Sequence, residues 1–438
     1  MIATFTRYLG LLRERDFRRL WLAQAVSQMG SEVTFLALPL VAILILKATP
    51  FEVALLGATQ FVAFGIFGLP AGVLVDRVPR KWILVVADLG RAVILVFVPI
   101  AAVSGALAMW QLYLISFLAS ILTVFFEIAY QAILPELVDR SRLAEGNSRL
   151  EVSRSAAQVI GPGLGGALVG VFTAPIAILV DALSYVASAS FLFGLHTGGQ
   201  PAARTGAPRL GMRREILEGL RFYRRSPLLL SASAAVVTVN VGFHLAGAIF
   251  LVFLVRELAM TPAAIGLALS IGSIGLLVGS AGAAAFGRRF GIGPTLIVGC
   301  GVASAAWFLI TIATPQTAFG LLAAVGVIQG MALPLLYVNN VTFRQTIAPD
   351  ELLGRVNATA RWLHWTAIPF GQLAGGLLAT VIGLREAIVV GAFIALLSVA
   401  WLLVSPLRSV RAMPSADARL LLLDPLADPV TPFAQPPT

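Results

Sequence analysis

The sequence is poor in charged residues and almost free of cysteine. Charged side chains make up 12% of the 438 residues, about half the share expected in a soluble domain. One cysteine, Cys300, supports neither a disulfide framework nor a cysteine-based metal site, and the three histidines are too far apart for a ligand motif. There is no Walker A sequence, so ATP is not expected to be the energy source. We therefore predict a protein with no cofactor and no metal.

Long apolar runs dominate what is present. Hydrophobic residues amount to 58% and the mean hydropathy is +0.92. A helix needs about 20 mostly apolar residues to cross a bilayer, and runs of that kind follow one another along the chain. The predicted spans are 18–46, 52–75, 82–104, 110–134, 149–171, 174–195, 227–255, 262–286, 292–313, 316–341, 357–381 and 384–404. The predicted fold class is an all-α integral membrane protein with twelve transmembrane helices.

Positive charge is concentrated in alternate loops. The net charge is +10, but the cations lie in short loops and not on a soluble face, which argues against nucleic acid as a partner. The opposite loops hold only Lys47, Arg256 and Arg385. Because cytoplasmic loops carry the excess of Lys and Arg, both termini are predicted to be cytoplasmic. No cleaved signal peptide is expected, because residues 1–19 lack a short apolar core.

The chain contains an internal repeat of six spans. An offset of 210 residues places Gly72 on Gly282 and Gly161 on Gly371. Two six-span halves in the same orientation are typical of transporters whose binding site lies between the halves, near the bilayer midplane. The predicted units are a bundle at 1–200, a cytoplasmic linker with a surface amphipathic helix at 201–225, a bundle at 226–405, and a disordered tail at 406–438.

A charged decapeptide joins the second and third spans. Residues Gly72 to Lys81 read Gly-Val-Leu-Val-Asp-Arg-Val-Pro-Arg-Lys. This loop resembles the signature G-x-x-x-D-R-x-x-R-K of the major facilitator superfamily, and the spans and the repeat resemble that superfamily too. The resemblance implies a gate latch in which Asp76 accepts hydrogen bonds from the start of span eleven, where the helix dipole favours an anion. Arg77 and Arg80 would then bridge carboxylates in the other half or in the neighbouring loop.

A plainer interpretation of the three cations in this loop is that they only fix the topology. An acid is not needed for that purpose, so the presence of Asp76 favours the gating role. Arg361 and His364 share a face of span eleven and are expected to lie close enough to take part. In the second half Phe286 stands where Asp76 stands in the first, which confines the predicted latch to the first half.

Span five contains the run Gly161-Pro162-Gly163-Leu164-Gly165-Gly166. Its G-P-x-x-G core resembles the antiporter signature of exporters in the superfamily. The loop Leu134–Val138 with Asn147, and the stretch Asp181–Ser184, resemble the branch that includes macrolide, tetracycline and enterobactin exporters. Two interpretations of the glycines stay open. They allow close helix packing with a bend at Pro162, or they serve exchange transport by shaping the contact between the halves.

Charged residues inside spans are costly and are functional candidates. Glu32 lies thirteen residues beyond Arg19, about 20 Å into the membrane at the rise of a helix, and span one lines the central cavity in the superfamily. It is the first candidate for proton coupling or cation binding; the alternative is a polar pair that orders the helix. Glu127 in span four can either pair with Arg154 in span five or face the cavity.

Other intramembrane polar groups receive structural interpretations. Asp88 and Arg91 lie one turn apart in span three and can pair with each other. Asp181 in span six is interpreted as a structural hydrogen-bonding group. His244 and Asn240 in span seven are candidates for the cavity, although a lone histidine is more often a satisfied polar group.

The sequence therefore predicts a secondary transporter and not an enzyme. It would act as a monomer in the bacterial plasma membrane and export an amphiphilic small molecule (a drug, macrolide or siderophore) in exchange for protons. The two halves would rock about a cavity at the midplane. The alternatives are an uptake symporter of the same fold, and a lipid flippase or membrane scaffold. The G-P-x-x-G core argues against uptake, and acids inside the membrane argue against a scaffold.

Overall fold

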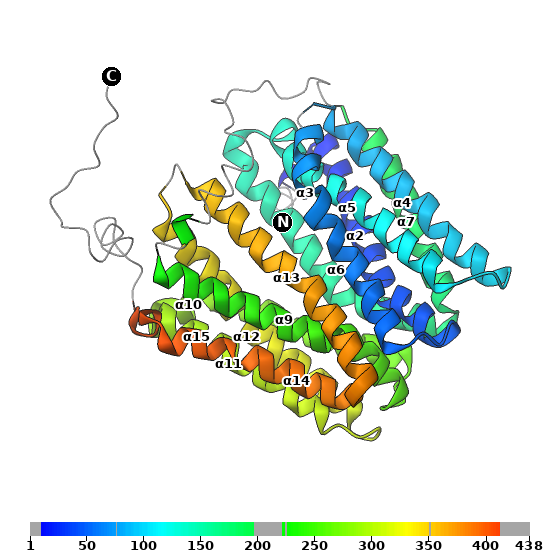
Figure 1. Cartoon of the computed structure of the whole chain (residues 1–438). Coiled ribbons are helices and arrows are strands. Elements are labelled where there is room, and N and C mark those ends of the chain that lie inside the picture. Colours follow the sequence, from blue (N-terminus) through cyan, green and yellow to red (C-terminus); the bar gives the residue numbers. More distant parts are fainter. Residues whose placement is uncertain (1–9, 76, 197–220, 224–225, 350–351, 412–438) are drawn as a thin grey trace, which may run out of the picture.

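The computed structural model describes residues 10–75, 77–196, 221–223, 226–349 and 352–411. All regular structure in these residues is helical, and the helices form two bundles (Figure 1). The first bundle contains α2 (Arg15–Leu40, continued by the π-helix η2 at Val41–Ile45), α3 (Pro50–Val75), α4 (Arg80–Val103), α5 (Met109–Leu137), α6 (Leu143–Val171) and α7 (Ala174–Phe193). The second contains α9 (Pro227–Arg256), α10 (Pro262–Phe290), α11 (Ile292–Thr311), α12 (Ala318–Ile347), α13 (Leu353–Ile382), α14 (Leu384–Leu396) and α15 (Ser398–Val404).

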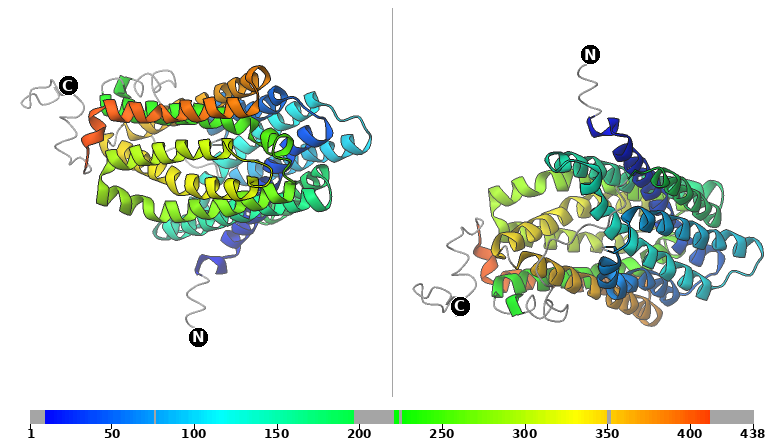
Figure 2. Two further views of the ribbon diagram at one scale, coloured as in Figure 1. Left: turned by 90° about the horizontal axis from the view of Figure 1, so that it is seen from below. Right: turned by 90° about the horizontal axis from the view of Figure 1, so that it is seen from above.

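Within the described residues, eleven helical segments are long and apolar enough to cross a membrane. The further long helix, α6, carries charges in its first half and occupies the place of the fifth predicted span. The twelfth predicted span is a single apolar segment made of α14 and α15. The long helices of both bundles run in roughly the same direction (Figure 2). The predicted all-helical fold is confirmed.

The helix bounds repeat with the offset found in the sequence. Adding 210 to the bounds of α6 gives 353–381, and α13 spans Leu353–Ile382. Adding 210 to the start of α7 gives residue 384, where α14 begins. The two bundles are therefore copies of one six-helix arrangement.

Most of the predicted linker lies outside the described residues, as does most of the tail. The start of that tail is ordered, however: Pro406–Ser409 forms a 3₁₀ helix in which Leu407 is buried. Gly293 at the start of α11 donates a backbone hydrogen bond of 3.0 Å to Val410. The second bundle thus extends a few residues beyond the predicted boundary at 405.

Successive helices alternate in direction, so each bundle has two ends. We call the end with residues 10–15 and 405–411 the terminal end, and the opposite end, with residues 46–49 and 257–261, the distal end. The bundles pack against each other through the pairs α6–α10 and α3–α13.

The distal end is where the two halves touch most closely. A Cβ added to Gly166 of α6 would lie 2.9 Å from Cα of Gly266 in α10. At the other seam, a Cβ added to Gly376 of α13 would lie 2.9 Å from Cα of Phe51 in α3. Both distances are too short for side chains, so these seams depend on glycine.

Close contact is lost toward the terminal end. The glycine contacts between the halves all lie in the distal parts of their helices, at Gly57, Gly163, Gly166, Gly170 and Gly376. Near the terminal end, a Cβ added to Gly72, Gly282 or Gly354 would have nothing within 4 Å. At the distal end, by contrast, the side chain of Arg256 donates a 2.6 Å hydrogen bond to the carbonyl oxygen of Ala48 in the other half. The structure is therefore closed at the distal end and open at the terminal end.

Candidate functional site

A cavity of about 290 Å³ lies in the first bundle, about midway along α2. Its wall comes from α2, α3, α4, α5 and α7, together with Trp365 of α13. One side is aromatic: Phe61 and Phe64 of α3 face Trp365, and the ring centroids of Phe64 and Trp365 are 4.7 Å apart. The other side is polar. The cavity can therefore hold a molecule with one apolar and one polar face.

The polar side is built mainly by one face of α2. Gln24, Ser27, Gln28 and Ser31 follow one another at spacings of three and one, so they share the face of the helix that looks into the cavity. The side chain of Gln24 donates to Gln28 at 3.4 Å. The Ser31 hydroxyl lies 2.7 Å from the hydroxyl of Tyr185 in α7. These groups offer amide and hydroxyl partners without carrying charge.

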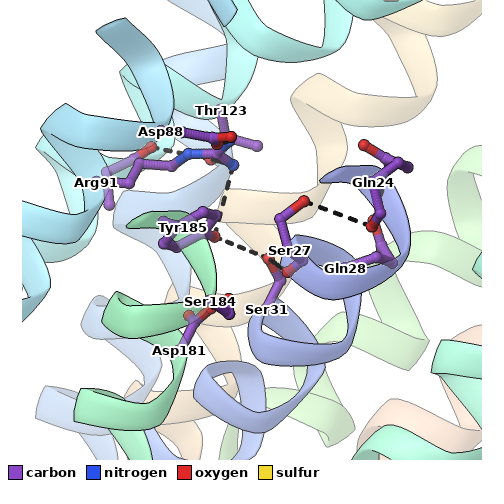
Figure 3. A network of polar contacts seen from close by, with 11 residues as sticks. Gln24, Ser27, Gln28, Ser31, Asp88, Arg91, Thr123, Asp181, Ser184 and Tyr185 are labelled. Atoms are coloured by element: carbon purple, nitrogen blue, oxygen red, sulfur yellow. Dashed lines mark hydrogen bonds and ion pairs between the residues drawn. The ribbon is translucent and has the colours of Figure 1, made fainter. Parts of the chain in front are cut away.

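A buried ionic group stands behind this face (Figure 3). Arg91 of α4 forms an ion pair with Asp88 one turn earlier, as the sequence predicts. The guanidinium also stacks on two aromatic rings, 4.5 Å from the centroid of Phe126 and 4.2 Å from that of Tyr185. Asp88 has no exposed surface and Arg91 is 4% exposed. Arg91 is thus fixed on three sides at the cavity wall.

Asp181 of α7 completes the group. It is fully buried and accepts a 3.1 Å hydrogen bond from the Ser184 hydroxyl at Oδ1, while Oδ2 has no hydrogen-bond partner within the described residues. Gly30 of α2 lies directly against it, because a Cβ there would meet Asp181 and would lie 2.9 Å from Cβ of Ser184. Asp181 and Arg91 both line the cavity. The sequence interpretation, which gave them structural roles, missed this position.

The two glutamates singled out in the sequence have different surroundings. Glu127 of α5 is half-buried and lines the cavity. Glu32 of α2 is half-buried but is not part of the cavity wall. It accepts a 3.4 Å hydrogen bond from Gln28 and points toward α6, where a Cβ on Gly161 would lie 3.0 Å from its Cγ. Arg154 is exposed, and among the described residues it forms no ion pair with Glu127. The pairing considered for Glu127 and Arg154 is absent from this conformation.

The candidates in α9 lie outside this cavity. Asn240 is buried and accepts a 2.8 Å hydrogen bond from the hydroxyl of Tyr337. Its amide nitrogen donates to the carbonyl oxygen of His364 at 3.3 Å. The ring of His244 meets Phe61 of the first half edge-on, with centroids 5.5 Å apart. Asn240 therefore holds helices of its own bundle together, whereas His244 lies at the contact between the halves.

The glycine run of span five serves two contacts at once. On one side α6 packs on α2, where a Cβ on Gly165 would lie 3.2 Å from Cα of Val33. On the other side it packs on α10 of the second half, through Gly166 and through a 2.9 Å hydrogen bond from the amide of Gly163 to the Ser270 hydroxyl. Pro162 lies inside α6 without ending the helix. The run thus gives close helix packing and also forms the seam between the halves. A role in exchange transport stays a prediction.

The charged loop between α3 and α4 contacts only the first half in the part that the structure describes. Arg80, at the start of α4, pairs with Glu136 in the last turn of α5 at 2.5 Å, and Lys81 donates to the carbonyl oxygen of Leu195 at 2.8 Å. Asp76 lies outside the described residues.

Arg77 and Arg361, the other cations of the proposed latch, are exposed. Neither has a side-chain partner among the residues that the structure describes. The contact of Asp76 with span eleven lies outside the described residues, and the gating role stays a prediction.

A model of the transmembrane secretion effector family matches residues 6–430. The chain belongs to this family of the major facilitator superfamily. It is 26% identical to the uncharacterized MFS-type transporter YfiS of Bacillus subtilis (strain 168), over 86% of this chain and 90% of that protein. It is 25% identical to macrolide efflux protein A of Streptococcus pyogenes, over 84% of this chain and 91% of that protein. A mutant of the nucleoside transporter NupG shares its fold, with a TM-score of 0.72 at 11% identity over 88% of this chain and 98% of that one.

The superfamily and the fold inferred from the sequence are therefore confirmed. The protein is a multi-pass membrane protein with the family and fold of membrane transporters, not those of enzymes. The likeness to NupG extends to the fold alone, so it does not set the direction of transport.

Proposed function

We propose that the protein exports amphiphilic small molecules across the bacterial plasma membrane in exchange for protons. The cavity is the observation that carries this proposal. Phe61, Phe64 and Trp365 offer flat apolar surface, and the opposite wall offers amides, hydroxyls and the carboxyl groups of Glu127 and Asp181. A site that is mostly apolar, with a few fixed polar groups, suits a drug-sized amphiphile. The efflux proteins among its relatives favour the same substrate class and the outward direction.

The conformation fits one step of such a cycle. Positive loops favour the terminal end as the cytoplasmic side, so the open cavity would face the cytoplasm and take up substrate there. Export would then require the distal seams at Gly166 and Gly376 to part while the terminal end closes. Closure would bring the Asp76 loop to span eleven, as the superfamily signature implies. The protein acts as a monomer in this proposal, because the cavity is built within one chain.

Proton coupling rests on the acids of the first half. Glu127 lies in the cavity wall, where substrate and proton can compete for the same space. Glu32 lies at the seam of α2 with α6, where a change in its charge would act on helix packing. Both stay candidates for the coupling role that the sequence predicts.

Reconstituted protein in sealed liposomes tests the proposal. A pH-sensitive dye inside the vesicles reports proton movement when a macrolide, a tetracycline or a catecholate siderophore is added. We expect substrate-dependent proton movement with at least one compound class, and a reduced rate in Glu127→Gln. Glu52→Gln is the matched control, because Glu52 only caps the start of α3 through Thr49 at 2.7 Å. Substrate uptake that leaves the internal pH unchanged would refute proton exchange.

The same vesicles distinguish export from uptake by the direction of proton movement. An importer of this fold would move protons together with substrate, so the dye would report the opposite sign for the same substrate gradient. A lipid flippase would translocate labelled phospholipid and ignore the three compound classes.

A further inference from the structure

The buried charges of the first bundle have no counterpart at the equivalent positions of the second. The helices α4 and α7 correspond to α11 and α14 under the offset of 210 residues, and the two helices of each pair pack against each other in their own half. Four polar residues of the first half (Asp88, Arg91, Asp181, Tyr185) fall on Val298, Gly301, Gly391 and Ala395 of the second. The second half therefore builds the same helix arrangement without any of these polar groups.

In the second half, small residues are enough for the equivalent helices to pack closely. A Cβ on Gly242 of α9 would lie 2.7 Å from Cβ of Ala395, so α9 and α14 meet with almost no space between their backbones. In the first half, α2 meets α7 just as closely at Gly30, but against the side chains of Asp181 and Ser184. Burying charges is costly, and apolar residues usually replace a buried ion pair without loss of stability. The fold does not require the charges, so their presence points to a function.

The charges in this cluster do not balance. Asp88 and Asp181 supply two carboxylates, and Arg91 is the one cation among them. Arg91 is committed to Asp88 by their ion pair and to its two aromatic neighbours by stacking. Asp181 therefore forms no ion pair of its own among the described residues, and its Oδ2, like Oδ2 of Asp88, is buried there without a hydrogen-bond partner. The Thr34 hydroxyl of α2 faces the Asp181 carboxyl. With all three groups ionised, the cluster carries one uncompensated negative charge.

The helices packed around Asp181 supply no other cation. The face of α2 that meets it carries only Gly30 and hydroxyl or amide groups. From α5, across the cavity, comes Glu127, which is a further acid. On α7 itself the nearest ionisable group is Tyr185, and Glu32 of α2 points away toward α6. A proton is the smallest cation that can neutralise a carboxylate enclosed this tightly.

We infer that Asp181 is the group that takes up and releases the proton exchanged for substrate. The proton adds to the carboxylate at Oδ2 and forms the neutral acid. The net charge of the cluster goes from −1 to 0, no other bond is made or broken, and deprotonation reverses the step. Asp88 and Arg91 form a permanent ion pair beside it. This inference rests on the proposed function, since it names the acid that carries out the exchange.

The position of Asp181 connects this step to substrate and to helix packing. Its carboxyl lies in the cavity wall, and the neighbouring Tyr185 hydroxyl contacts Ser31 on the polar face of α2. The same helix packs through Val33 and Glu32 on the glycine run of α6, which forms a distal seam. A charge change at Asp181 therefore acts directly on α2, the helix shared by the cavity and the seam.

Two neutral variants test the inference in the proteoliposomes described above. Asp181→Asn keeps the shape of the side chain, and Asp181→Ala resembles the small residue Gly391 at the equivalent position of the second half. Both leave the Asp88–Arg91 pair balanced, so at least one should fold, as checked by monodispersity in detergent. We expect proton movement to fall at least tenfold, and the pH dependence of transport to disappear. Exchange of labelled for unlabelled substrate without a gradient should continue. Asp181→Glu should restore proton movement, and Glu52→Gln serves as the control.

The outcomes separate the inference from the proposed function. Absence of substrate-dependent proton movement in the wild-type protein would overturn both. Wild-type proton movement that persists in a neutral Asp181 variant, with unchanged pH dependence, would overturn the inference and leave the proposed function standing. Loss of gradient-free exchange in a folded variant would also overturn it, because Asp181 would then bind substrate. A sodium gradient that replaces the proton gradient in the wild-type protein would refute the proton as the coupled ion.

Discussion

Replacing Gly166 by alanine is expected to open the distal end. Gly166 faces Gly266 across the seam between α6 and α10. An added Cβ would lie 2.9 Å from Cα and 3.1 Å from the amide nitrogen of Gly266. These are backbone atoms, which cannot rotate out of the way as a flexible side chain can. The methyl group fits only if the two helices move apart, and in this conformation they are packed at the distal end.

The size of the effect follows from the cost of overpacking. Inserting a methyl group into a well-packed contact costs about 1–3 kcal/mol. That cost applies only to conformations in which the distal seam is closed. The equilibrium should therefore shift by about 5- to 150-fold toward conformations with an open distal end. Alanine also gains up to about 1 kcal/mol of helix propensity over glycine, but this gain is the same in every conformation and cancels.

Distances between spin labels at the distal ends of α6 and α10 measure this shift. The one native cysteine, Cys300, is buried in α11, so introduced cysteines can be labelled selectively. Gly247→Ala is the matched control, because Gly247 lies in α9 and an added Cβ there has nothing within 4 Å. Distance distributions of Gly166→Ala that coincide with those of Gly247→Ala would refute the idea that this glycine contact holds the distal end closed.

Three further outcomes are expected. Arg256→Gln removes the hydrogen bond to Ala48 across the distal end, which is worth about 1 kcal/mol. The equilibrium measured by the same spin-label distances should therefore shift about fivefold toward an open distal end. An unchanged distance distribution would show that this hydrogen bond does not stabilise the closed distal end. Ala259 has a left-handed backbone with φ 50°, and Ala259→Gly should raise the free energy of unfolding by about 1 kcal/mol because glycine adopts this conformation without strain. The midpoint of thermal unfolding in detergent should therefore rise, and a fall would show that the backbone at this position is not strained. Arg80→Ala removes the 2.5 Å ion pair with Glu136. It should lower that midpoint more than Glu136→Gln does, because the Arg80 side chain is 13% exposed and also donates to a backbone carbonyl; equal effects would refute this.

The spans, their alternation and the repeat could be predicted from the sequence. Crossing a bilayer requires about 20 apolar residues in a row, and this requirement is local and can be counted along the chain. The repeat is a relation between residue identities, so the offset of 210 needs no coordinates. The motif at Gly161–Gly166 could likewise be recognised as a packing surface, because closely spaced glycines serve the same purpose in any membrane helix pair. The predicted span ends differ from the helix ends by up to six residues, as at the start of α6 and the end of α12.

Which side chains line the cavity was determined by the tertiary structure. In a soluble helix the polar face shows the direction of solvent. A helix of this chain is apolar nearly all round, so the sequence does not show which face meets lipid, a neighbouring helix or the cavity. The rotation of α4 and α7 places Arg91 and Asp181 in the cavity wall, and the rotation of α2 turns Glu32 toward α6. These rotations are set by contacts between distant segments, such as Gly30 against Asp181 and Gly166 against Gly266. For that reason the sequence determined that this protein is a membrane transporter, and only the packing of its helices determined which buried charges reach the cavity.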